Sequence, residues 1–62
     1  MKLDGTKINI LRAEKGLKIK DLAEASNVAS STIKKGFNKD IEPVCIGRIA
    51  KALDVAVIDI IQ

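Results

Sequence analysis

Apolar residues recur along most of this chain at the three- and four-residue spacing of amphipathic helices. The inward stripe of one segment consists of Ile19, Leu22, Ala23 and Ser26, and a later segment repeats the spacing with Ile46, Ile49, Ala50 and Leu53. The alternation over residues 55–58 is too short and too close to the end to predict a strand. The pattern predicts an all-α fold, a compact bundle of four to five short helices that forms a single domain over residues 1–62.

Residues with known end preferences mark the first two helices. Asp4 can cap a helix that runs to about Lys15, and Gly16 follows it at the position where a positive φ is common. The second helix is expected from about Ile19 to Ser26. Asn27 comes next, and asparagine tolerates the left-handed conformation better than most residues. A tight turn is therefore expected at Asn27.

The second half of the chain shows similar signals. A third, short helix is expected at residues 30–35, with Ile33 facing inward and Gly36 ending it. Pro43 suits the first turn of a fourth helix, because its missing N–H would have no partner there. A last apolar turn is expected over residues 57–61.

The second and third helices have the residues of a helix-turn-helix centred on residues 19–37. Such a pair needs a small residue where the helices touch, a permissive residue at the turn and apolar residues inside. Ala23 and Asn27 meet the first two needs, and the apolar set consists of Leu22, Val28 and Ile33. The first turn of the third helix should then project outward.

Charge is uneven along the chain, whose net charge is +3. Residues 15–39 hold six lysines and two acidic residues, a net +4, whereas residues 40–62 hold two basic and four acidic residues, a net −2. A basic middle segment suits a polyanion. A lysine-rich surface that is merely exposed to water would have the same charge. The charge alone therefore does not distinguish it from a surface that binds a polyanion, and the helix-turn-helix motif is needed to do so.

Several function classes find no support in the composition. Cys45 is the only cysteine and there is no histidine, so a disulfide within the chain and the usual zinc sites are excluded. Cys45 is expected to pack as a small hydrophobic residue. No phosphate-binding glycine loop or catalytic cluster is present, which argues against an enzyme, and no cofactor or small-molecule ligand is indicated. No segment suits a membrane span or a signal peptide, so a reduced, cytoplasmic setting is expected.

The whole arrangement resembles the lambda-repressor-like (Cro/Xre) helix-turn-helix family of transcriptional regulators. The segment "ILRAEKGL" is similar to the family's first helix and exit, and "KDLAEASNVASSTI" to its paired helices. The segment "RIAKALDVAVIDII" is similar to its fourth helix and closing turn, which a plain helix-turn-helix does not predict. A headpiece of the LacI type shares "KIKDLAEASNV", but there the motif opens the chain.

The resemblance implies that this chain binds double-stranded DNA with its third helix in the major groove. The side chains that would face bases are Ser30, Ser31, Thr32 and Lys35. Phosphates would be held by backbone N–H groups at the start of the second helix and by the side chains of Lys18, Lys20, Lys34, Asn38 and Lys39.

The chain departs from the family pattern at several positions. Ile19 stands where a phosphate-binding glutamine is usual. Ala29 stands where a serine or threonine usually caps the third helix, and losing this cap costs about 1 kcal/mol unless Ser30 substitutes for it. Gly36 occupies a position that is normally apolar. Phe37 is expected to fill the space left beside Gly36.

The apolar C-terminal turn predicts an interface. Its residues cannot all point inward, and an exposed aliphatic cluster often marks a contact surface. A homodimer is therefore expected, with a surface formed by Val57, Ile58 and Ile61. Two alternatives to a complete DNA-binding repressor stay open. One is a protein-interaction module of the antitoxin or anti-repressor type that keeps the fold without specific DNA binding, and the other is the DNA-reading part of a longer repressor.

Overall fold

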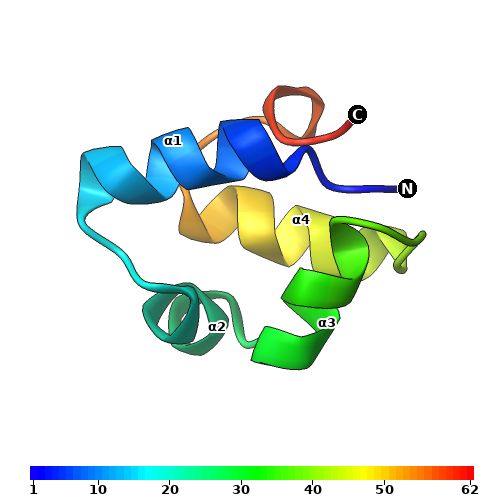
Figure 1. Ribbon diagram of the computed structural model, residues 1–62, viewed down its shortest axis with the longest axis horizontal. Helices are drawn as coiled ribbons and strands as arrows, with labels where there is room; N and C mark the ends of the chain where they lie inside the picture. Colours follow the sequence, from blue (N-terminus) through cyan, green and yellow to red (C-terminus); the bar gives the residue numbers. More distant parts are fainter.

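Four α-helices and one short 3₁₀ helix follow one another along the chain: α1 (Gly5–Lys15), α2 (Ile19–Ser26), α3 (Ser30–Gly36), α4 (Pro43–Ala52) and η1 (Val57–Asp59). A computed structural model describes residues 1–62. Figure 1 shows α1 and η1 along one edge of the molecule, α2 and α3 along the opposite edge, and α4 between them. The predicted all-α fold is confirmed, and its one extended contact is an antiparallel bridge between Leu3 and Ile61.

Local signals place the helix ends where the sequence predicts them. The Asp4 side chain accepts a hydrogen bond of 3.1 Å from the N–H of Lys7 and caps α1. Gly16 and Asn27 end α1 and α2 in the left-handed conformation, with φ of 68° and 57°. Asp54 adopts the same conformation after α4, with φ of 57°, and this turn was not predicted from the sequence.

Replacing Asp4 with alanine should destabilise the protein by about 1 kcal/mol, because the first-turn N–H of α1 loses its acceptor. Urea unfolding followed by circular dichroism measures this loss. Thr6→Ala is the matched control, since Thr6 is exposed in the same turn and forms no capping hydrogen bond. Equal stabilities of the two variants would contradict a capping role for Asp4.

One hydrophobic core joins all four α-helices and the C-terminal turn. Its fully buried side chains come from both ends of the chain as well as from the helices: Leu3, Ile8, Leu22, Ile33, Ile46, Ile49, Leu53 and Ile60. Ser26 is buried among them because its hydroxyl donates a hydrogen bond of 2.6 Å to the carbonyl of Leu22. None of the helices has the length and apolar character needed to cross a membrane.

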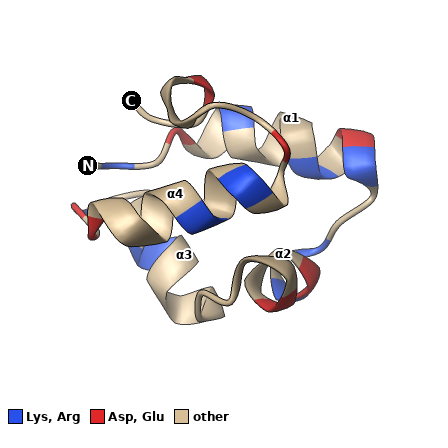
Figure 2. Ribbon diagram, turned by 180° about the vertical axis from the view of Figure 1, so that it is seen from behind, with Lys and Arg blue, Asp and Glu red and all other residues tan.

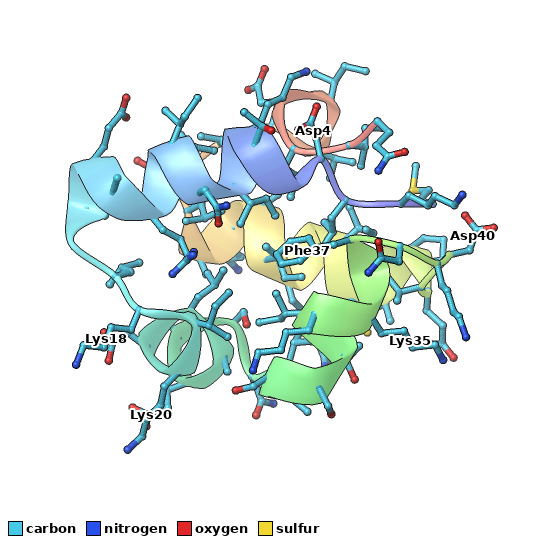
Figure 3. The ribbon with its side chains drawn as sticks, viewed as in Figure 1. Asp4, Lys18, Lys20, Lys35, Phe37 and Asp40 are labelled. Atoms are coloured by element: carbon cyan, nitrogen blue, oxygen red, sulfur yellow. The ribbon has the colours of Figure 1, made fainter.

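The end of α3 differs from its prediction. Gly36 is the last residue of α3, one residue beyond the predicted end, and Phe37 after it has an ordinary φ of −69°. A Cβ atom on Gly36 would lie 2.9 Å from the Cδ1 atoms of both Leu3 and Ile41, so these two side chains fill the space beside it. The expectation that Phe37 fills this space is wrong. Its ring packs instead over Gly5, at the start of α1 (Figure 3).

Close packing at Gly36 gives a testable contrast with Gly47. Gly36→Ala should destabilise the fold, because overpacking typically costs about 1–3 kcal/mol and the gain in helix propensity offsets at most about 1 kcal/mol. Gly47→Ala should stabilise it by about 0.5–1 kcal/mol, since no atom lies within 4 Å of the added methyl group. Thermal unfolding of both variants measures the difference. Shifts of the same sign would contradict this account of Gly36.

Candidate nucleic-acid interface

A tight turn fixes the angle between α2 and α3. The N–H of Asn27 donates to the carbonyl of Glu24 at 3.4 Å, and the N–H of Val28 donates to that of Ala23 at 3.2 Å. Val28 is then buried between the helices and packs in the same cluster as Leu22 and Ile33. The chain therefore leaves α2 in a new direction, and the first turn of α3 lies at the edge of the molecule (Figure 1).

The α3 helix forms a ridge between two open hollows. A hollow of about 400 Å³ on the α2 side is lined by Lys20, Ala23, Glu24, Asn27, Val28, Ala29 and Ser30. A second hollow, of about 530 Å³, is lined by Thr32, Lys35, Asp40, Ile41, Glu42 and Cys45. A helix that stands clear on both sides has the form needed to enter the major groove of B-DNA, which is about 12 Å wide.

The four predicted base-facing residues, Ser30, Ser31, Thr32 and Lys35, all belong to α3, the helix that forms this ridge. Ser31 and Lys35 are exposed and lie one helical turn apart. Ser30 and Thr32 are half-buried, and each lines one of the two hollows. The hydroxyl groups of Ser30, Ser31 and Thr32 form no hydrogen bond within the chain. The hydroxyl group of buried Ser26, in contrast, donates one. The donors and acceptors of the three α3 hydroxyl groups are therefore free for an external partner.

The phosphate candidates flank this set on both sides. Lys18 and Lys20 extend from the start of α2, at one end of the α2–α3 edge (Figure 3). The base-facing candidate Lys35 lies toward the other end of this edge. Lys34, Asn38 and Lys39 are exposed within and just after α3. None of the lysines forms an ion pair within the chain, so their charges remain available.

The start of α2 has three backbone N–H groups without an acceptor. The N–H of Lys18 donates to the carboxylate of Asp21 at 2.9 Å. The first N–H bonded to a backbone carbonyl is that of Leu22, which leaves three groups without an acceptor, those of Ile19, Lys20 and Asp21. An anion could approach these three groups, although the charge of Asp21 opposes it.

The start of α3 lacks a side-chain cap. Ala29 occupies the N-cap position, and the Ser30 hydroxyl does not replace the missing acceptor. The N–H groups of the first turn therefore remain unpaired beside the predicted base-facing residues. The expected loss of the cap is confirmed, and Ser30 does not substitute for it.

Three carboxylates that were not predicted as site residues lie beside the predicted site. Glu24 lines the hollow on the α2 side, and Asp40 and Glu42 line the other. The four-residue spacing of Lys20 and Glu24 indicates a shared face of α2, so Glu24 could have been found. Figure 2 accordingly shows acidic as well as basic residues on α2. A carboxylate repels phosphates and can accept a hydrogen bond from the amino group of cytosine.

The remaining candidates lie outside α3 itself, although Cys45 lines the same hollow as Thr32 and Lys35. Of the residues expected to form a dimer surface, Ile58 is 70% exposed, whereas Val57 and Ile61 are half-buried and pack against the core. Cys45 is also half-buried and packs against the core near the start of α4. The single ion pair joins the amino group of Met1 to Asp40 at 3.2 Å, beyond the end of α3.

Comparison with known proteins agrees with this geometry. A search of the curated proteins and a search of the solved structures each returned no match to this chain. The family model of the Cro/C1-type HTH DNA-binding domain matches residues 7–62. The matched range contains α1 from its third residue onward and the whole of α2, α3, α4 and η1. The match therefore extends well beyond the α2–α3 pair, and this chain belongs to the Cro/C1-type helix-turn-helix DNA-binding domain family.

Proposed function

We propose that this chain is a small transcriptional regulator that binds a specific double-stranded DNA sequence, with α3 in the major groove. The observation that carries the proposal is the outer surface of α3. Its first turn presents the unpaired hydroxyls of Ser30, Ser31 and Thr32, and Lys35 follows one turn after Ser31. Hydroxyl groups hydrogen-bond base edges, and a lysine there can donate to the O6 and N7 atoms of guanine.

Contacts to the DNA backbone would fix the register of α3. Lys18 and Lys20 would bind phosphates on the α2 side, and Lys34, Asn38 and Lys39 would do so beyond the first turn of α3. Phosphate contacts orient a protein on the duplex without selecting a sequence. Affinity and specificity should therefore depend on different side chains.

Ser31→Ala and Lys35→Gln should change which sequence binds best, whereas Lys39→Gln should weaken binding to all sequences alike. Losing a base contact should reduce discrimination at one position by about 1–3 kcal/mol. Competition binding against every single-base variant of a preferred site measures both effects. Since all three side chains are exposed, circular dichroism should show an unchanged fold. Uniform weakening by Lys35→Gln would place Lys35 at a phosphate and contradict its base-facing role.

Repression by occupancy is the regulatory mode we propose. A protein of this size that covers a promoter site excludes other proteins from the same stretch of DNA. A reporter gene with the preferred site placed in its promoter should be transcribed less when the protein is present. A protein-interaction module would behave differently, because it would bind one protein partner stoichiometrically while DNA titrations stayed flat.

A further inference from the structure

Side chains of opposite charge line the same hollow beside α3. This hollow, of about 530 Å³, is lined by Thr32 and Lys35 of α3 and by residues of the segment that leads into α4, which include Asp40 and Glu42. Lys35 and Glu42 are exposed, and neither forms an ion pair within the chain. Glu42 is the N-cap residue of α4, but its side chain accepts no capping hydrogen bond. The hollow therefore holds one free ammonium group and one free carboxylate.

Asp40 lines the same hollow but is not equivalent to Glu42. The Oδ1 atom of Asp40 forms an ion pair of 3.2 Å with the amino group of Met1, so the charge of Asp40 is already balanced within the chain. A glutamate side chain is also longer than that of an aspartate, so the carboxylate of Glu42 extends further from the backbone. Glu42 is therefore the carboxylate of this hollow that is available to a partner.

A G·C base pair has the hydrogen-bonding groups that complement such a pair of side chains. In the major groove guanine presents two acceptors, O6 and N7, and its partner cytosine presents an amino group as a donor. A lysine ammonium group has only donors, and a carboxylate has only acceptors. In an A·T pair, thymine presents its O4 acceptor in place of the cytosine amino group, so a carboxylate directed at the pyrimidine is repelled.

We propose that Lys35 and Glu42 together recognise one G·C base pair, with the ammonium group of Lys35 on guanine and the carboxylate of Glu42 on the amino group of cytosine. This inference rests on the proposed function and adds to it a specificity-determining residue outside α3. Lys35 alone would also bind a phosphate or the N7 atom of adenine. The carboxylate beside it repels phosphates and the O4 atom of thymine. Glu42 therefore restricts Lys35 to one kind of base pair.

Competition binding against all four base pairs at each position of the preferred site tests this recognition. The wild-type chain should prefer G·C over A·T by about tenfold at one position. Glu42→Ala should reduce this preference to less than about threefold, because the cytosine amino group loses its acceptor and thymine is no longer repelled. Asp40→Ala is the matched control, since it removes the same charge from the same hollow, and it should leave the preference unchanged. Circular dichroism should show that both variants are folded, since both side chains are exposed.

Lys35→Gln shows whether the two side chains contact the same base pair. It should change the preference at the position that Glu42→Ala changes. Effects at two different positions, or equal effects of Glu42→Ala and Asp40→Ala, would overturn the proposal. Tighter binding of Glu42→Ala to every sequence alike would also overturn it, because the carboxylate would then only repel phosphates. If the wild-type chain preferred no site at all, the proposed function would fail as well, whereas a G·C preference that Glu42→Ala kept would overturn this inference alone.

Discussion

Replacing Ile33 with alanine should destabilise the protein by about 2–5 kcal/mol. Ile33 is fully buried and is the one fully buried side chain that α3 contributes to the core. Its truncation leaves a cavity in the core cluster to which Leu22 of α2 also belongs. Native stability is about 0.05–0.15 kcal/mol per residue, so a chain of this length has little margin. The variant should therefore contain a large unfolded fraction near body temperature.

Urea unfolding measures the effect of Ile33→Ala, with Ile58→Ala as its matched control. Ile58 is 70% exposed, and its truncation should change the free energy of unfolding by less than about 0.5 kcal/mol. DNA affinity of Ile33→Ala should fall with the folded fraction and recover at low temperature. A loss of less than about 1 kcal/mol would mean that the side chain of Ile33 does not anchor α3 to the core.

Binding to DNA should weaken about 150-fold when the salt concentration rises from 50 to 200 mM. This value follows from four phosphate contacts per chain, by Lys18, Lys20, Lys34 and Lys39, because each contact lowers the slope of log affinity against log salt by about 0.9. All four side chains are exposed and unpaired within the chain, so they lose no internal contact when they bind DNA. Fluorescence anisotropy of a labelled duplex at several salt concentrations gives the slope.

Single substitutions separate phosphate contacts from a general effect of charge. Lys39→Gln should reduce the slope by about one. Lys7→Gln removes the same charge from α1, at the opposite edge of the molecule, and should leave the slope unchanged (Figure 1). If both variants changed the slope equally, binding would reflect net charge rather than contacts at the α2–α3 edge.

Features that depend on neighbouring residues were predictable from the sequence. Asn27 and Gly16 end their helices because few residues tolerate a positive φ, and Pro43 begins α4 because it needs no hydrogen-bond acceptor. The inward face of α4 followed from its periodicity in the same way. The α2–α3 pair and its exposed first turn could therefore be predicted without coordinates.

Features that depend on distant residues were not predictable. Leu3 and Ile41 lie on opposite sides of Gly36 in the sequence, and only the folded chain brings them into the space beside that glycine. The N–H of Leu3 also donates to the carbonyl of Gly36 at 2.8 Å, which joins the N-terminal segment to the end of α3. Asp40 and Glu42 line the hollow beside α3, and the segment that holds them is joined to the distant N-terminus by the hydrogen bond from the N–H of Ile41 to the carbonyl of Met1, at 2.9 Å.

Selection of binding sites from a random duplex library tests the central claim, that α3 recognises a specific DNA sequence. The purified chain should enrich one short sequence at low salt, and the same sequence at higher salt with fewer bound molecules. Lys35→Gln should enrich a different sequence, because the base contacts change while the phosphate contacts remain. Recovery of unselected sequences under all conditions, with a folded protein, would contradict sequence-specific binding by this chain.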